Sequence, residues 1–324
     1  MNKVSCLAVA ASLCIATSAF SQGYPTKPIR LVVTFPPGGV DVSMRPLLPT
    51  MDRELGQPFI LEYRSGAGGV VGHEYVARQP ADGYTILITL ANSMVVASVV
   101  RRTTPFDPLK DFTLISLGTE SMGVIVAHPS FPPGDLKEMA AWARQNPGKA
   151  VWATSGIGSS WHINGELIKL GAKFDVLHAP FQGFGPMIPA ILGGQVPMAM
   201  FSYTVAQPFI TSGKVKLLGV TNTGPIFKSM IPPGVQTLAE LVPGLQSMPD
   251  WIGLAGPAGL PEPIVRRVQA AYVKSLNEPE SRERLLRDKV VVVGSTPEQF
   301  ALRVKSDLAL IARAVKESGI PPQD

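Results

Sequence analysis

The residues best suited to binding a ligand lie in turns that follow strand-like runs and precede helix-like runs. Three such turns are rich in glycine or in glycine and serine: Phe35–Asp41, Arg64–Gly69 and Thr154–His162. A turn of this kind presents backbone N–H groups at a helix N-terminus, and that geometry attracts anions. In an open α/β sheet such turns lie at the carboxyl ends of the strands, where ligands bind. We therefore predict that they bind an anionic group such as a carboxylate.

The first turn combines a stiff exit from a strand with a close approach to a ligand. Two prolines follow Phe35, and Gly38 and Gly39 then allow the backbone to come near a bound molecule. Asp41 has two interpretations: it caps the next helix, or it contacts an amino or hydroxyl group of the ligand. Two further prolines within eight residues predict an irregular start to that helix.

The second turn is Ser65-Gly66-Ala67-Gly68-Gly69, and it precedes a predicted helix from Val70 to Arg78. Three glycines within four residues favour a concave row of N–H groups, which suits the two oxygens of a carboxylate. The pattern does not match the dinucleotide-binding fingerprint, because Val71 stands where its third glycine would be. A plain tight turn is the alternative interpretation.

The third turn places Ser155, Gly158 and Ser159 ahead of a helix whose first turns contain Trp161 and His162. Hydroxyl groups and backbone amides therefore converge at this helix start. His162 is either a structural hydrogen-bonding residue or a general base, the latter with Ser159 as the nucleophile of a secreted hydrolase. The sequence places no acidic partner beside His162.

Further candidates for the binding site also follow strand-like runs. Asn92 comes just after the run Tyr84–Leu90, and aromatic and polar residues mix after two runs in the second half of the chain: Phe181, Gln182, Gly183, Phe201, Ser202 and Tyr203. Residues of this kind suit the wall of a pocket for the part of the ligand that is not a carboxylate. The alternative is that Phe181 and Phe201 are core residues.

Motifs for catalysis and for cofactor or metal binding are missing from the sequence. Neither Gly148-Lys149-Ala150 nor Gly213-Lys214-Val215 completes a phosphate-binding loop, because no Ser or Thr follows the lysine. No G-x-S-x-G elbow occurs, and His73-Glu74 lacks the second histidine of a zinc-binding helix. The four histidines show no metal-ligand spacing. We therefore expect a protein that is not an enzyme and binds no cofactor and no metal.

The elements that would position these turns alternate short apolar or β-branched runs with longer amphipathic runs. This alternation is typical of α/β units. It pauses near Met122 and again across residues 223–249, where the chain would cross between lobes. We predict two α/β domains joined by two crossovers, with 24–122 plus 249–324 in lobe 1 and 123–246 in lobe 2. The C-terminal part is predicted to be helical, over Ile264–Leu276, Glu278–Arg287 and Pro297–Ser318.

The first 21 residues have the composition of a cleavable signal peptide. Lys3 is followed by an apolar run and by Ala19-Phe20-Ser21, so cleavage is expected after Ser21. Both cysteines, Cys6 and Cys14, lie in this segment, and its removal would leave no thiol. The 29 basic and 24 acidic residues are spread along the chain, which indicates a solvated surface and no nucleic-acid role. We expect a periplasmic protein.

Six short motifs, in order, resemble those of the Bug/TctC solute-binding proteins of tripartite tricarboxylate transporter systems. They are Phe35–Gly39, Arg64–Gly69, Ala81–Thr85, Asp107–Phe112, Ser155–Ser159 and Leu192–Val196. The resemblance runs from Tyr24 to the C-terminus and implies a two-lobed, type II periplasmic binding protein fold that closes over a carboxylic acid held in a cleft between the lobes. We expect a monomer that passes a small organic carboxylate to membrane permease subunits. A sensor that reports to a receptor is the alternative.

The sequence departs from the family pattern in two of these turns. One residue, where the family has two, separates the paired glycines of the first turn from Asp41, so the role of Asp41 is open. Ser202 follows Phe201 where the family often has Asp or Asn. That change disfavours an amino-acid ligand, because its ammonium group would lack a negative partner. Trp161 either stacks on an aromatic or longer-chain carboxylate or packs on the lobe surface.

Overall fold

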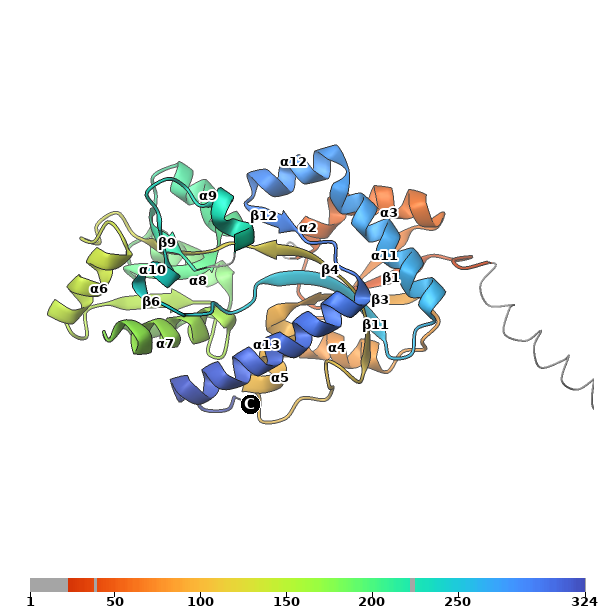
Figure 1. Cartoon of the computed structure of the whole chain (residues 1–324), viewed down its shortest axis with the longest axis horizontal. Coiled ribbons are helices and arrows are strands. Elements are labelled where there is room, and N and C mark those ends of the chain that lie inside the picture. The colour runs from red at the N-terminus through yellow and green to blue at the C-terminus, as the bar shows by residue number, and fades with distance from the viewer. Residues whose placement is uncertain (1–22, 38–39, 222–224, 324) are drawn as a thin grey trace, which may run out of the picture.

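The computed structural model describes residues 23–37, 40–221 and 225–323. The predicted signal peptide, and Gly38 and Gly39 of the first turn, lie outside the described residues. Within these ranges the chain forms two six-stranded sheets, and Figure 1 shows them in two halves that lie side by side. Helices cover both sheets, so the chain is a two-lobed α/β protein.

The first sheet has the strand order β12-β4-β11-β3-β1-β2. Strand β1 runs parallel to both β2 and β3, whereas β11 is antiparallel to β3 and β4, and β12 is antiparallel to β4. The carboxyl ends of β1, β2 and β3 therefore share one edge, and the turns that follow them gather there. The bounds are β1 Ile29–Val33, β2 Phe59–Tyr63, β3 Thr85–Leu90, β4 Phe112–Ser121, β11 Trp251–Pro257 and β12 Val290–Val292.

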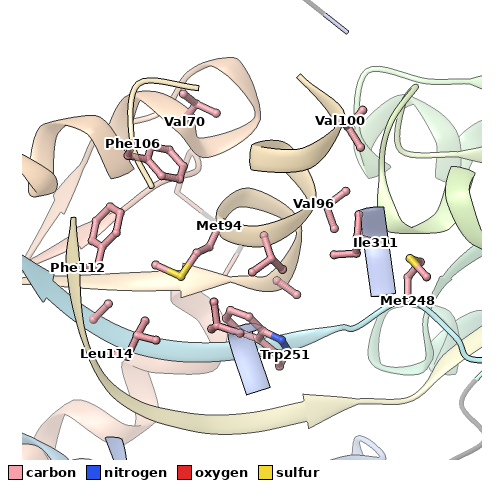
Figure 2. Packing of buried hydrophobic residues seen from close by; sticks show 14 of the residues in the cluster. Val70, Met94, Val96, Val100, Phe106, Phe112, Leu114, Met248, Trp251 and Ile311 are labelled. Carbon is pink, nitrogen blue, oxygen red and sulfur yellow. The ribbon is translucent and has the colours of Figure 1, made fainter. Parts of the chain in front are cut away.

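Helices cover both faces of the first sheet. One face packs against α4, η3, α5 and α13, and Figure 2 shows part of this layer around Trp251. The other face packs against α3 and α11. The helical segments are α2 Asp41–Met44, η1 Arg45–Leu47, α3 Leu48–Leu55, η2 Ala67–Gly69, α4 Val70–Ala77, η3 Asn92–Val96, α5 Ala97–Val100, α11 Glu262–Asn277, α12 Pro279–Arg287 and α13 Pro297–Ser318.

The second sheet has the strand order β10-β9-β5-β8-β6-β7. β6 runs parallel to β7 and β8, and β5 is antiparallel to its two neighbours. Helices α6 and α7 cover one face, and α8 and α9 cover the other. The bounds are β5 Gly123–Ala127, α6 Leu136–Gln145, β6 Val151–Thr154, α7 Ser160–Ala172, β7 Leu177–Pro180, α8 Phe184–Leu192, β8 Met198–Ser202, α9 Tyr203–Thr211, β9 Lys216–Val220, η4 Pro225–Met230, β10 Gln236–Thr237 and α10 Leu238–Leu241.

Two segments connect the sheets. Only Met122 separates the end of β4 from the start of β5, and the chain returns between the end of α10 and the start of β11. The two connections touch, because the N–H of Ser121 donates to the carbonyl of Asp250 at 2.8 Å. The lobe boundaries at 122/123 and 246/249 stay a prediction.

Packing between helices also joins the two lobes. Ile163 and Leu167 of α7, in the second lobe, belong to the same buried cluster as Val96, Val100 and Ile311 of the first lobe. The three residues of the first lobe are labelled in Figure 2. Burial of this shared apolar surface stabilises one relative placement of the lobes along the α7–α13 side.

The sequence pattern predicted most of these elements but missed one long strand. The three C-terminal helices are confirmed, and so is the irregular start of the helix after Asp41, which breaks into α2, η1 and α3. Strand β4, Phe112–Ser121, was not predicted, because polar residues interrupt its apolar run. In the folded chain Ser116 and Thr119 of this strand are buried between β11 and β12.

Candidate ligand-binding site

Asp41 anchors the first turn instead of capping a helix. It is the first residue of α2 and is 1% exposed, and its Oδ2 accepts hydrogen bonds from Arg45 Nε at 3.1 Å and Tyr63 Oη at 3.0 Å. The prediction of a helix cap is wrong, because Val40 is at the N-cap and makes no side-chain cap bond. Asp41 therefore ties α2 to the end of β2. Phe35, at the start of the same turn, is partly buried.

The second turn has a backbone that only glycine-rich sequence adopts easily. Gly66, Ala67, Gly68 and Gly69 all have positive φ, at 144°, 48°, 65° and 99°. The N–H of Gly69 donates to the carbonyl of Gly66 at 2.9 Å. In the part of the chain that the structure describes, the N–H groups of Ala67 and Gly68 meet no acceptor, and both residues are exposed. Such N–H groups suit the oxygens of an anion.

The ends of β1, β2 and β3 meet at this turn. A Cβ on Gly69 would come within 2.7 Å of Ser93 Cβ and 3.4 Å of Phe35 Cε2. Asn92, which the sequence also selected, begins η3 directly after β3 and is partly buried. Three segments that are distant in the sequence are therefore brought together, and only glycine fits at their meeting point.

The third turn is held by its own side chains. Ser159 is the N-cap of α7: its Oγ accepts from the N–H of His162 at 3.2 Å and lies 2.8 Å from the carbonyl of Gly156, to which it donates. The N–H of Gly158 donates to His162 Nδ1 at 3.0 Å. The Ser159 hydroxyl thus contacts backbone groups and not the imidazole, which favours the structural interpretation of His162 over a nucleophile–base pair.

A second histidine stacks on His162. The rings of His162 and His178 have centroids 4.0 Å apart and planes inclined by 11°, and His178 Nε2 lies 2.6 Å from Thr154 Oγ1. Burial lowers the pKa of each ring to about 4, and the positive charge of Lys169 adds to the effect on His162. Both imidazoles are therefore neutral near pH 7, and both support the turn between β6 and α7.

Of the two aromatic and polar segments in the second half of the chain, only the first lies beside the third turn. Phe181 N–H donates to Thr154 O at 3.0 Å, and Gly183 N–H donates to Ser155 O at 3.2 Å, so residues 181–183 run along the third turn, with Gln182 exposed. Ser202 and Tyr203 lie at the start of α9 and are partly buried, and Tyr203 N–H donates to the carbonyl of Met122. These two residues therefore lie at a connection between the lobes.

Two aromatic candidates lie in the core of the second lobe. Trp161 is 6% exposed, and its indole packs on Gly123, where a Cβ would come within 2.6 Å of Trp161 Cζ3. Phe201 is fully buried in another cluster of the same lobe, against which Phe181 packs. The structure thus favours the packing alternative for Trp161 and Phe201 over direct contact with a ligand.

One hydrogen bond links the candidate turns across the lobes. The N–H of Ser160, at the start of α7, donates to Asn92 Oδ1 of the first lobe at 3.2 Å. Ser160 Oγ lies 3.5 Å from the carbonyl of Pro249 in the return connection. The N-terminus of α7, the end of β3 and both connections therefore converge at the junction of the two lobes.

Sequence reasoning missed two polar side chains at the same edge. Thr34 Oγ1 and Asp250 Oδ2 are both buried without a hydrogen-bond partner among the described residues. Burial, together with the negative charge of Glu120, raises the pKa of Asp250 to about 7. The signal for Asp250 was its place at the end of the second pause of the α/β pattern, where it follows Pro249 in a stretch of few charges.

Other parts of the surface do not compete as chemical centres. A cavity of about 330 Å³ lies between α7, the return connection and α13, lined by residues that include Leu167, Gln246 and Arg313. It lies away from the glycine-rich turns. Over the ranges that the structure covers, no three His, Cys, Asp or Glu side chains cluster as metal ligands do. Nor does any helix in those ranges have the length and apolarity to cross a bilayer.

The fold and the paired turns define a periplasmic binding protein, and solved structures of that class match it closely. The periplasmic binding protein BugD superposes with a TM-score of 0.80 at 30% identity, covering 93% of this chain and 100% of the other. MatC from Rhodopseudomonas palustris with bound malate gives 0.77 at 30% identity, covering 90% and 100%. An R. palustris protein solved with adipate gives 0.82 at 26% identity, covering 93% and 100%.

The sequence comparisons identify the family. A family model described as the tripartite tricarboxylate transporter family receptor, TctC, matches residues 44–320. A UPF0065 protein from the tcbD–tcbE intergenic region of Pseudomonas sp. strain P51 is 32% identical over 289 residues, which are 88% of this chain and 84% of that protein. The chain belongs to the TctC family of periplasmic solute-binding receptors, whose role is binding and not catalysis.

Proposed function

We propose that this protein closes around a small organic carboxylate, which lies between the turn Ser65–Gly69 of the first lobe and the turn Ser155–Ser159 of the second. The observation that carries the proposal is the pair of exposed N–H groups of Ala67 and Gly68, which lack acceptors in the described chain. The positive end of the α7 dipole lies at the same junction and favours a negative charge there, while the N–H groups of Ser160 and His162 already have acceptors.

The ligand class that the site supports best is an aliphatic dicarboxylate. Two structural neighbours hold malate and adipate. Trp161 is packed in the core, so the residue that most favoured an aromatic ligand does not line the site. A turn with free N–H groups on one lobe and a helix N-terminus on the other suit a molecule with a carboxylate at each end, because each lobe would then contribute to closure.

The protein would act outside the cytoplasm and deliver its ligand to a membrane partner. We propose that residues 1–21 are removed on export and that the loaded receptor passes the carboxylate to the permease subunits of a tripartite transporter, as a monomer. The family of the chain and the composition of its first residues support this route. N-terminal sequencing of the protein from a periplasmic extract should begin at Gln22.

Isothermal titration calorimetry of the protein purified from the periplasm tests the proposal. Malate, adipate, succinate and benzoate are the ligands, and lysine is the control with an added cationic group. We expect saturable binding of at least one aliphatic dicarboxylate with a Kd in the micromolar range, about −8 kcal/mol, and none of lysine. Saturable binding of benzoate alone would overturn the aliphatic preference, and no carboxylate binding at pH 6 would overturn the function.

A further inference from the structure

Asp250 lies at the junction of the lobes, where both connections between them meet. Its backbone carbonyl accepts from Ser121 of the first connection. The carbonyl oxygen of the preceding residue, Pro249, lies 3.5 Å from Ser160 Oγ at the start of α7. Asp250 thus directly follows a residue that contacts Ser160, and Ser160 in turn bonds to Asn92 of the first lobe.

The side chain of Asp250 faces away from the charged network beside it. The next residue, Trp251, donates from Nε1 to Asp307 of α13 at 2.7 Å. Successive side chains along an extended strand point to opposite faces, and the bond from Ser121 to Asp250 continues the β4–β11 ladder by one residue. The Asp250 carboxyl therefore lies on the face opposite Trp251 and α13.

Among the described residues, no Lys, Arg or His side chain pairs with the Asp250 carboxyl. The nearest network contains one guanidinium, Arg303, which Glu120 and Asp307 already share at 2.5 and 2.9 Å. That network has a net negative charge, and Glu120 acts on Asp250 as a like charge. Within the described ranges Asp250 Oδ2 is buried without a partner, although the residue as a whole is partly exposed. A buried polar atom in this state needs a further partner.

We propose that Asp250 contacts the bound ligand and holds a proton in that complex, donating its O–H to an oxygen of a ligand carboxylate. The inference rests on the proposed function. The proton comes from solvent and stays on Asp250, so no covalent bond of the ligand changes. An O–H group that donates to a carboxylate forms a strong, short hydrogen bond, whereas an ionised Asp250 would repel the same ligand.

The proposal predicts that binding weakens as pH rises through the neutral range. The free carboxyl has a pKa of about 7, because burial and Glu120 both favour its protonated form. A ligand carboxylate accepting its proton favours that form further. Binding of adipate at pH 8 must therefore take up about one proton, and affinity falls about tenfold from pH 6 to pH 8. His162 and His178 remain neutral in this window, since their pKa values are about 4.

Calorimetry in two buffers of different ionisation enthalpy tests the proposal, with adipate and malate as probes. At pH 8 the wild type should take up close to one proton on binding. Asp250→Asn keeps a neutral donor, so its affinity should be equal at pH 6 and pH 8 and should exceed that of the wild type at pH 8. Asp250→Ala should lose at least tenfold at pH 6, and Asp175→Asn, outside the cleft, should behave as the wild type.

The outcomes separate this inference from the proposed function. Binding of adipate or malate that shows no proton uptake at pH 8, or an affinity that rises with pH, would overturn the role of Asp250 and leave the receptor function standing. Absence of binding by the wild type at pH 6 would overturn both. If Asp250→Asn retains the pH dependence of the wild type, another group takes up the proton and the inference fails.

Discussion

The two glycine-rich turns are supported by buried imidazoles that act in opposite ways. In the first lobe, His73 Nδ1 lies 2.9 Å from the carbonyl of Gly69 and donates to it. In the second lobe, His162 Nδ1 accepts from the N–H of Gly158. A protonated imidazole has only donors, so acid preserves the first bond and breaks the second. The hydrogen bond that supports the first turn therefore survives protonation of its histidine, whereas the one that supports the second turn requires a neutral histidine.

The turns also differ in what determines their shape. The first depends on four consecutive positive φ angles and on close packing of Gly69 against Ser93. The second depends on side-chain bonds from Ser159 and from the two stacked histidines. Similar composition thus yields one turn that is fixed by its backbone and one that is fixed by its side chains. Each can be disrupted by a different change.

The largest expected effect is on stability in acid. The pKa of His73 is lowered by burial from 6.5 to about 4, as are those of His162 and His178. Between pH 6.5 and 4 the unfolded chain binds protons that the folded chain does not, so the free energy of unfolding falls as the pH is lowered. The fall is roughly 3 kcal/mol for one such histidine. Urea denaturation at several pH values measures it.

Two variants and one local probe make this test specific to the turns. His162→Asn should reduce the fall, and His128→Asn, at a site away from both turns, should leave it unchanged. Hydrogen exchange at pH 4.5 should show loss of protection at the Gly158 amide, with the Gly69 amide still protected. Equal loss at both amides would contradict the difference between the turns.

A substitution at Gly69 tests the backbone-fixed turn. Gly69→Ala places a Cβ 2.7 Å from Ser93 Cβ at a φ of 99°, so the turn must shift, and we expect at least tenfold weaker binding of adipate by calorimetry. Gly56→Ala is the matched control, since Gly56 has a φ of 75° and nothing within 4 Å of its added Cβ. It should cost about 1 kcal/mol of stability and no affinity. Equal loss of affinity in both variants would contradict the prediction.

The smallest expected effect comes from the side-chain-fixed turn. Ser159→Ala removes the N-cap of α7 and the bond to Gly156, which should lower the free energy of unfolding by about 1 kcal/mol. Adipate binding should weaken by about threefold, because the remaining histidine bonds still hold the turn. Ser212→Ala, which removes a hydroxyl bond to Pro208 at the end of α9, should leave affinity unchanged. Tighter binding by Ser159→Ala would contradict the role of the cap.

The local conformation of the turns was readable from the sequence. Glycines at 66, 68 and 69 are needed where φ is positive, and Ser159 before a helix is a local capping signal, so both turns could be located without tertiary information. The C-terminal helices were predicted for the same reason, since periodicity and caps are local. Six short motifs in order sufficed for the family, which the family model then confirmed.

Tertiary structure decided which of these residues are buried in the core. Trp161 and Phe201 are of a residue type that often lines a ligand pocket, but their neighbours across the second lobe bury them in the core. Asp41 is of a residue type that often caps a helix, yet its carboxylate accepts a hydrogen bond from Tyr63, 22 residues later. The chemical role of such a side chain depends on segments that no local pattern identifies.

Asp250 and the histidine pair depended on the folded chain most strongly. The pairing of β6 with β7 sets Trp152 opposite His178 and so brings His178 under α7, next to His162. Burial of Asp250 arises where two connections more than 120 residues apart along the chain come together. Desolvation depends on everything that surrounds a group, so a pKa shift cannot be read from its sequence neighbours. The turns were therefore predictable, whereas the protonation states beneath and between them required the three-dimensional structure.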